Sequence, residues 1–307
     1  MKSPRNPVNP VYPHYFADPF VLRHGDAYYA YGTGGVNTNG RVIEVLRSSD
    51  LRTWESMGGS LEPLSLETPH DYWAPEVAVH QGRFYMYYSA GKGDQGHTLR
   101  VATADRPLGP FWDMGLNLSP GEPFAIDPHP FRDDDGQWYL FYAKDFLDGP
   151  RVGTALAVDR LRSMSQLEGR PATVLRASAD WQLYQRQRPM YGALYDWHTL
   201  EGPFVVKRGG LYYCFYSGGN WQNPSYGVSY AIAEHPLGPW TEPQVGRAAV
   251  LQTVPGRLSG PGHNSLVRGP DGQDYLVYHA WDERGTARRM CVSRLEWTLQ
   301  GPRVELD

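Results

Sequence analysis

The sequence has little of three things: cysteine, net charge and long apolar segments. Only two cysteines occur among 307 residues. Because Cys214 and Cys291 fall in strand-like segments far apart in the chain, we expect buried free thiols rather than a disulfide. The formal net charge of −4 is small for this length, which argues against nucleic acid or an anionic membrane as the main partner. No segment has the roughly 18 apolar residues of a membrane span, so none is predicted.

Two further absences concern the N-terminus and helices. Residues 1–10 lack the apolar core of a secretory signal. This predicts a cytoplasmic protein, although a secreted protein without its signal peptide would look the same. Helical periodicity is nearly missing, and no capped amphipathic segment is long enough to indicate a stable helix. The sequence therefore predicts an all-β protein.

A motif that occurs five times, Gly-x-x-Tyr-x-x-Tyr, dominates the sequence instead. Each copy stands between two short β-rich segments, so the glycine is predicted in a hairpin turn and the tyrosines on the following strand. The copies are 54 to 74 residues apart, more than the roughly 40–45 residues of a propeller blade with short loops. They begin at Gly25, Gly82, Gly136, Gly210 and Gly272.

These repeats predict a five-bladed β-propeller with four-stranded antiparallel blades, forming a single domain over residues 1–307. One four-stranded sheet cannot bury both of its faces, whereas five sheets packed radially share a core and leave only short edges. The segment 160–198 has weak periodicity and is expected to be a loop insertion. Together with residues 217–226 it should shape the rim of a pocket.

Acidic residues stand where the first strands of several repeats begin. In a propeller these strands line the central channel, so the positions should converge although they are far apart in the sequence. We expect Asp18 to begin an extended segment, because a residue before proline is disfavoured in the helical region. The alternative is that Asp-Pro and Glu-Gly-Pro are only turn signals. The five positions are Asp18, Glu76 with Pro75, Asp127, Glu201 and His263.

The motifs around these positions resemble glycoside hydrolase family 43. In chain order they are Ala17-Asp18-Pro19-Phe20, Trp73-Ala-Pro-Glu76, Ile126-Asp127-Pro128, Glu201-Gly-Pro-Phe204 and Gly260-Pro-Gly-His263-Asn-Ser265. The resemblance covers about residues 10–298. It implies a five-bladed propeller that acts as an inverting β-xylosidase, α-L-arabinofuranosidase or arabinanase.

The resemblance also implies three catalytic roles. Asp18 would be the general base that activates water, Glu201 the general acid, and Asp127 the residue that adjusts the pKa of the acid and orients substrate. Inverting hydrolysis needs one carboxylate on the water and one carboxylic acid on the leaving oxygen. A third carboxyl group nearby helps to keep the acid protonated, since like charges in a partly dry site disfavour a second ionisation.

Other residues are expected to bind substrate, the two tryptophans from their positions and Arg288 from the resemblance. Trp73 would stack on a sugar ring, the alternative being an ordinary packing residue, and Trp221 would help to close a short pocket. Arg288 matches an arginine that reaches substrate hydroxyl groups near the acid. If the match to the family were displaced by one residue, Arg289 would have this role instead.

His263 matches a histidine at the centre of the channel, which in some relatives lies near a calcium ion. Calcium takes six to eight oxygen ligands, and no oxygen-rich loop is evident, so an ion there would depend on water. A hydrogen-bonding histidine without metal is favoured, and no cofactor is required. Asp133–Asp135 resembles half of a calcium loop but is expected in a solvated hairpin turn.

The sequence favours one substrate class over another. Tyr195-Asp-Trp-His198 looks more like exo-acting arabinofuranosidases than β-xylosidases of the family, and no β-sandwich domain follows as in many of those xylosidases. We therefore expect removal of terminal α-L-arabinofuranosyl residues from arabinan or arabinoxylan oligosaccharides. The alternatives are a β-D-xylosidase, a non-catalytic carbohydrate-binding propeller, and a phosphorylase, which would need a cationic cluster such as His14, Arg288 and Arg289.

Overall fold

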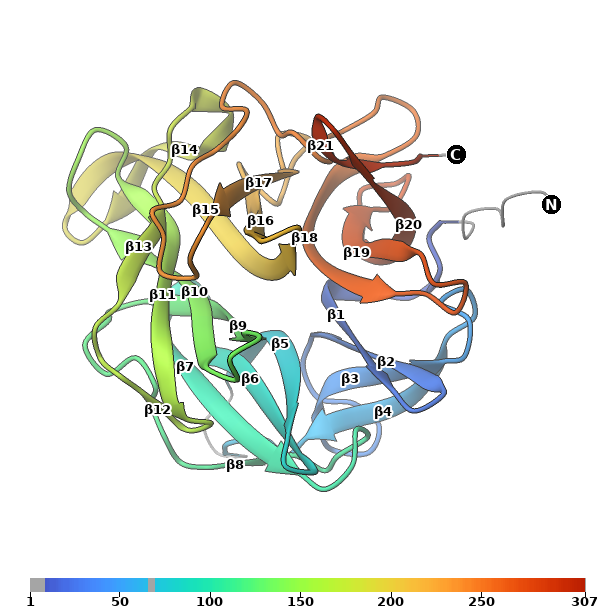
Figure 1. Ribbon diagram of the computed structural model, residues 1–307. Coiled ribbons are helices and arrows are strands. Elements are labelled where there is room, and N and C mark those ends of the chain that lie inside the picture. The colour runs from blue at the N-terminus through green and yellow to red at the C-terminus, as the bar shows by residue number, and fades with distance from the viewer. Residues whose placement is uncertain (1–8, 66–69, 307) are drawn as a thin grey trace.

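The computed structural model describes residues 9–65 and 70–306, and this part of the chain consists almost wholly of β-strands. Within it the single helical element is η1 (Asp180–Gln182), one turn of 3-10 helix. None of the described segments forms a helix that is long and apolar enough to cross a membrane. The strands form sheets that curl around a common centre (Figure 1). The prediction of an all-β protein is confirmed.

Three of the sheets have four strands each, in sequence order. The first contains β1 (Ala17–His24), β2 (Ala27–Thr33), β3 (Val42–Ser48) and β4 (Glu55–Leu61). The second contains β5 (Asp71–His80), β6 (Arg83–Lys92), β7 (Gln95–Ala104) and β8 (Trp112–Asp113). The third contains β18 (Ser259–Arg268), β19 (Asp274–Trp281), β20 (Arg288–Thr298) and β21 (Gly301–Val304). Neighbouring strands are antiparallel, as predicted for four-stranded antiparallel blades.

A fourth sheet has nine strands, because two antiparallel groups are joined through a parallel pair. The joint lies between β11 and β15, where Gly153 pairs with His198 and Thr154 with Thr199. The first group contains β9 (Ala125–Arg132), β10 (Trp138–Phe146), β11 (Gly153–Ser163), β12 (Gln166–Leu167) and β13 (Ala172–Leu175). The second contains β14 (Leu183–Met190), β15 (Ala193–Arg208), β16 (Leu211–Gly218) and β17 (Gly227–Ala233).

The prediction that residues 160–198 form a loop is wrong. This segment contains the end of β11, the strands β12, β13 and β14, the turn η1 and the start of β15. β12 and β13 pair with β11, and β14 pairs with β15. The short strands have polar exposed faces, which is why the sequence shows little hydrophobic alternation there.

The repeated glycines occupy the predicted hairpin turns. They lie between β1 and β2, β5 and β6, β9 and β10, β15 and β16, and β18 and β19, with φ between 59° and 87°. Only glycine adopts this left-handed conformation without a steric cost from Cβ. The five turns therefore explain why glycine begins every copy of the motif.

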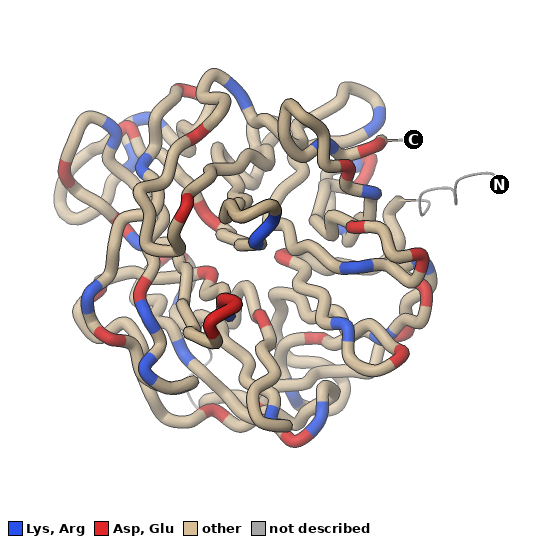
Figure 2. The backbone as a smooth tube through the Cα atoms, in the orientation of Figure 1, with Lys and Arg blue, Asp and Glu red and all other residues tan. Residues whose placement is uncertain are grey.

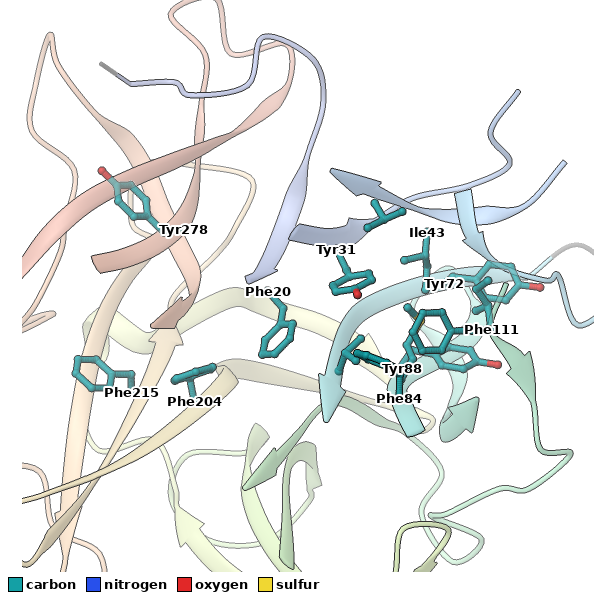
Figure 3. Packing of buried hydrophobic residues seen from close by; sticks show 14 of the residues in the cluster. Phe20, Tyr31, Ile43, Tyr72, Phe84, Tyr88, Phe111, Phe204, Phe215 and Tyr278 are labelled. Atoms are coloured by element: carbon teal, nitrogen blue, oxygen red, sulfur yellow. The ribbon is translucent and has the colours of Figure 1, made fainter. Parts of the chain in front are cut away.

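The last tyrosine of each motif is buried in the core. Figure 3 shows Tyr31 and Tyr88 packed with Phe111 in one cluster of aromatic side chains. Tyr31 donates its hydroxyl hydrogen to the carbonyl of Pro107 at 2.7 Å, which offsets the cost of burying a polar group. The five residues, each at most 3% exposed, are Tyr31, Tyr88, Tyr142, Tyr216 and Tyr278.

The strands nearest the centre share one irregularity. β1, β5, β9, β15 and β18 each contact the next, and β18 contacts β1. Each has a register shift at which one residue has φ between 46° and 58°. A bulge of this kind re-aims the side chain next to it. The residues are Asp18, Ala74, Asp127, Gly202 and His263.

This bulge overturns the expectation that Asp18 begins an extended segment. Asp18 has φ 52° and Asp127, also before a proline, has φ 58°. Restriction by the following proline disfavours the right-handed helical region, but it leaves the left-handed region open when surrounding contacts hold the residue there. Such a backbone costs on the order of 1 kcal/mol or more and is typical of functional sites.

Two smaller predictions concern thiols and charge. Cys214 and Cys291 are both buried and free, as expected. Figure 2 shows lysine and arginine interspersed with aspartate and glutamate along the described chain. No broad region of one sign is visible in that view, in keeping with the small net charge.

Candidate active site

Three carboxyl groups from three strands line one cavity: Asp18 from β1, Asp127 from β9 and Glu201 from β15. The two aspartates are themselves bulge residues, and Glu201 immediately precedes the bulge at Gly202. The repeated backbone irregularity therefore directs carboxyl groups from distant parts of the sequence toward one space. The remaining lining residues are Tyr15, Thr33, Trp73, Ile126, Trp221, His263 and Arg288.

Asp18 is held as a carboxylate by several partners. Its Oδ1 lies 3.1 Å from Arg288 Nη1 and 3.4 Å from His263 Nδ1, and Thr33 donates its hydroxyl hydrogen to Oδ2. Burial by itself would raise the pKa of Asp18, but other effects, of which the positive charge of Arg288 is the largest, hold that pKa well below its usual value. Asp18 is consequently ionised at neutral pH.

The surroundings of Asp127 have the opposite effect, because they raise its pKa. Burial raises its pKa, the negative charges of Glu201 and Asp18 raise it further, and the result lies well above the usual value. One hydrogen bond opposes this, since the N–H of Gly202 donates to Asp127 Oδ2 at 2.9 Å. Asp127 therefore tends to keep a proton while its neighbours are charged.

Glu201 has the pKa of a group that changes protonation near neutral pH. Burial raises the pKa of Glu201 to about 7, and the charge of Asp18 acts in the same direction. The hydroxyl of Tyr226, which donates to Glu201 Oε1 at 2.6 Å, and the charge of Arg288 lower it. A carboxylic acid and a carboxylate thus coexist in one cavity, as acid and base catalysis by two carboxyl groups requires.

Tyr226 links the surroundings of Glu201 to those of Asp18. Its ring stacks on His279 at 5.7 Å between centroids and 7° between planes, and the N–H of Asp18 donates to His279 Nδ1 at 3.1 Å. Burial lowers the pKa of His279 to about 4, so this ring is neutral at pH 7. An ideal Cβ on Gly262 would lie 1.9 Å from the Tyr226 ring, so glycine is required there.

Sequence reasoning missed Tyr226 and His279 as parts of the site. Tyr226 ends the segment 217–226 that was expected only to shape the rim, and His279 lies inside β19 with no motif around it. The glycine in Gly260-Pro-Gly262-His263 was the available signal, because a glycine outside a turn indicates the close approach of another group.

The predicted substrate-binding residues also line the cavity. Trp73 stacks on His97 at 3.7 Å between ring centroids, so one face of its indole is already covered. Trp221 lies beneath Arg288, whose Cζ is 4.4 Å from the indole centroid. Arg289 instead contacts the carbonyl of Pro13 and, at 3.0 Å, Asp282. The structure therefore places Arg288, and not Arg289, in the cavity.

Glu76, at the second of the five predicted strand entrances, forms a separate buried pair. Its Oε2 lies 2.6 Å from His129 Nδ1, and the N–H of Val205 donates to the other ring nitrogen at 2.9 Å. His129 Nδ1 therefore carries the hydrogen shared with Glu76. Burial raises the pKa of Glu76, but this residue does not line the cavity of the other three carboxyl groups.

The described residues do not offer a ready-made metal site. No group of three or more His, Cys, Asp or Glu side chains among residues 9–65 and 70–306 is arranged to hold an ion. His263 Nδ1 lies 3.9 Å from Asp127 Oδ2, and burial lowers the pKa of His263, which suits a neutral hydrogen-bonding ring. Asp133 forms an ion pair with Lys207 at 3.0 Å. A calcium ion near His263, the alternative to a histidine without metal, would still depend on water ligands.

A second cavity adjoins the first. The two share Trp73, Ile126, Glu201 and Trp221, so Glu201 stands at their boundary. The second cavity is lined further by residues from the β6–β7 turn, from β10 and β11, and from β14 and β15. They include Asp94, Asp145, Thr154, Tyr184, Arg188 and Trp197.

Comparison with known proteins agrees with this geometry. Residues 7–302 match the family model described as Glycosyl hydrolases family 43. The chain is 29% identical to the β-D-galactofuranosidase xynD of Aspergillus niger, over 95% of this chain and 83% of that protein. It is 26% identical to the extracellular exo-α-(1→5)-L-arabinofuranosidase ArbA of Cellvibrio japonicus, over 94% and 86%.

Solved structures show the same likeness. The crystal structure of a thermostable family-43 glycoside hydrolase is 32% identical and superimposes with a TM-score of 0.84, covering 98% of this chain and 96% of that one.

Proposed function

Because the chain belongs to glycosyl hydrolase family 43, we propose that it removes terminal α-L-arabinofuranosyl residues from arabinan or arabinoxylan oligosaccharides by inverting hydrolysis. Membership in the family makes the chain a glycoside hydrolase, so the alternative of a non-catalytic binding propeller is set aside. The observation that carries the mechanism is the opposite effect of the surroundings on the pKa values of Asp18 and Glu201.

In the proposed reaction Asp18 acts on the attacking water and Glu201 acts on the leaving oxygen. Asp18, kept ionised by Arg288, accepts a proton from water as the water oxygen bonds to the anomeric carbon. Glu201, protonated in a large fraction of molecules near neutral pH, gives its proton to the leaving oxygen as the glycosidic bond breaks. The sugar is released with inverted configuration, and Asp18 and Glu201 exchange protons with solvent before the next cycle.

Asp127 and Glu201 are coupled groups. The charge of Glu201 raises the pKa of Asp127, so the two carboxyl groups tend not to be ionised together and the protonation of each depends on that of the other. The hydrogen bond from Gly202 fixes the orientation of Asp127. His263, between Asp18 and Asp127, separates the two aspartates as a neutral ring.

A five-bladed propeller is the architecture we propose for the whole chain. Its support is the ring of contacts among β1, β5, β9, β15 and β18 and the bulge that each of these strands carries. In this interpretation the nine-stranded sheet is two blades joined by the short parallel pairing of β11 with β15.

The choice of sugar rests on the relatives. ArbA of Cellvibrio japonicus is named for exo-acting arabinofuranosidase activity, which supports the proposed substrate. β-D-Xylosidase activity is the second candidate, since a Humicola insolens protein named xylosidase/arabinosidase 43B is 25% identical over 95% of this chain.

A panel of three 4-nitrophenyl glycosides tests the proposal: α-L-arabinofuranoside, β-D-xylopyranoside and β-D-galactofuranoside. We expect the largest kcat/KM on the arabinofuranoside and no measurable turnover by the Asp18→Asn variant, which lacks the base for water. Preference for the xyloside would move the assignment to β-xylosidase. Preference for the galactofuranoside would assign the specificity named for the Aspergillus niger relative.

A further inference from the structure

We propose that the second cavity binds the sugar of the leaving group and that Arg188 is its specificity-determining residue, selecting a neutral hydroxylated ring. This inference rests on the proposed function, since it takes Glu201 as the general acid. A general acid lies where the departing oxygen meets the rest of the leaving group. Glu201 stands between a cavity that contains Asp18 and one that contains Arg188. The scissile bond at Glu201 therefore places the leaving group beside Arg188.

Arg188 is fixed by three contacts. Its Nη2 lies 2.6 Å from Asp94 Oδ2, and its Cζ lies 4.7 Å from the ring centroid of Tyr184 and 5.4 Å from that of Trp197. The Arg188 side chain is 13% exposed, whereas that of Asp94 is 64% exposed. A guanidinium held between rings loses little freedom when it binds a ligand.

The ion pair joins two segments that are distant in sequence. Asp94 lies in the turn between β6 and β7, and Arg188 lies on β14. Both line the cavity, so the pair closes part of its rim. The rim thus depends on the segment 160–198, which supplies Arg188.

The backbone of β14 is shaped for this contact. Its register shifts between Gln185 and Arg188, and Gln187 adopts φ 50°, a left-handed conformation that is unfavourable for a residue with Cβ. Asp196 offsets this cost, since its Oδ1 accepts the N–H of Gln187 at 3.0 Å. The shift re-aims the residue that follows, which is Arg188.

The lining suits a hydroxylated sugar ring rather than a purely apolar group. Aromatic rings such as Trp197 and Tyr184 suit the C–H face of a pyranose or furanose. The carboxyl group of Asp145 already has hydrogen-bond partners, because Thr154 and Tyr191 donate to its two oxygens at 2.8 and 2.7 Å. Arg188 has five N–H donors, more than its ion pair with Asp94 uses, so donors remain for hydroxyl oxygens.

The test compares two substrates that share the cleaved sugar but differ in the leaving group. One is the 4-nitrophenyl arabinofuranoside, and the other is an arabinofuranosyl xylobiose or arabinobiose. We expect Arg188→Ala to lower kcat/KM on the oligosaccharide about 10- to 100-fold, mainly through KM, because bonds from a charged donor to hydroxyl groups are lost. On the nitrophenyl glycoside, which offers no hydroxyl group there, we expect less than about a threefold change.

Two further variants separate this role from a structural one. Asp94→Asn removes the ion pair at an exposed position and should raise KM for the oligosaccharide in the same direction, by a smaller factor. Arg186→Ala is the matched control, since Arg186 lies on the same strand, pairs with Asp196 and is 71% exposed. We expect it to leave both substrates unchanged.

The outcomes are distinct. Equal losses on both substrates in Arg188→Ala, or an unchanged KM for the oligosaccharide, would overturn the assignment of Arg188. If the wild-type protein cleaved neither arabinofuranoside, the proposed function itself would fail first. Affinity of Glu201→Gln for the intact oligosaccharide, measured by calorimetry with and without Arg188→Ala, gives a second readout that needs no turnover.

Discussion

At the residue scale, the site depends on giving similar carboxyl groups different pKa values. Arg288 is the main source of the difference, because its guanidinium lies 3.1 Å from Asp18 and opposes the effect of burial on that group. Glu201 lacks such a close positive charge, so burial raises its pKa to about 7. The two groups should consequently produce a bell-shaped dependence of kcat/KM on pH, in which Glu201 sets the alkaline limb.

Tyr226 should control the position of that alkaline limb. Its hydroxyl stabilises the charged form of Glu201 through a 2.6 Å hydrogen bond, so Tyr226→Phe should raise the pKa of Glu201 and move the limb to higher pH by about one unit. The measurement is a pH profile of kcat/KM. Tyr213→Phe is the control, because Tyr213 packs against Trp297 and does not line the cavity. An unmoved limb in Tyr226→Phe would remove Tyr226 from this role.

Replacement of Glu201 by glutamine should lower kcat/KM by an amount that depends on the leaving group of the substrate. A xylose or arabinose leaving group needs protonation, so Glu201→Gln should reduce kcat/KM on oligosaccharides at least about 100-fold. Nitrophenolate leaves without a proton, and the loss on nitrophenyl glycosides should stay below about tenfold. Steady-state kinetics on both classes provide the comparison, and equal losses would mean that Glu201 is not the acid.

At the scale of elements, the sequence predicted regular hairpins well and irregular pairing poorly. The Gly-x-x-Tyr-x-x-Tyr motif located five turns, because glycine marks a left-handed turn and the tyrosine marks a buried strand. It gave no sign of β12 and β13, which have two and four residues, or of β14, whose residues are mostly polar or partly exposed. The bulges were also missed at Asp18 and Asp127, since proline restricts the preceding residue but does not specify its conformation.

The joint between β11 and β15 should be sensitive to one added methyl group. An ideal Cβ on Gly153, which has φ 149°, would lie 1.9 Å from the carbonyl oxygen of His198. Gly153→Ala should therefore lower the free energy of unfolding by about 2–4 kcal/mol, because the strands must separate. Thermal or urea denaturation measures this, with Gly121→Ala as control, since its Cβ would meet no atom within 4 Å. Equal stability of the two variants would contradict the account of the joint.

At the scale of the whole molecule, residues far apart in sequence were predicted to converge, and they do. Asp18, Asp127, Glu201 and His263 line one cavity because the strands that carry them surround the centre. This followed from the repeat, since equivalent positions of equivalent strands must meet in a closed arrangement. Glu76 holds an equivalent position but pairs with His129. Residues 160–198 were predicted to shape the rim of a pocket, and Arg188 and Trp197 of that segment line the second cavity. The part of Asp94 was not predicted, because the β6–β7 turn carries no motif that links it to β14.

The central claim is that Asp18 and Glu201 carry out hydrolysis with inversion on a terminal arabinofuranose. Time-resolved proton NMR of an arabinose-decorated xylo-oligosaccharide tests it most directly, because the anomeric signal of the released sugar is observed before mutarotation. We expect the β-anomer of arabinose to form first and the Glu201→Gln variant to release little or no arabinose. Initial appearance of the α-anomer would mean retention and would contradict the assignment of Asp18 as a base acting on water.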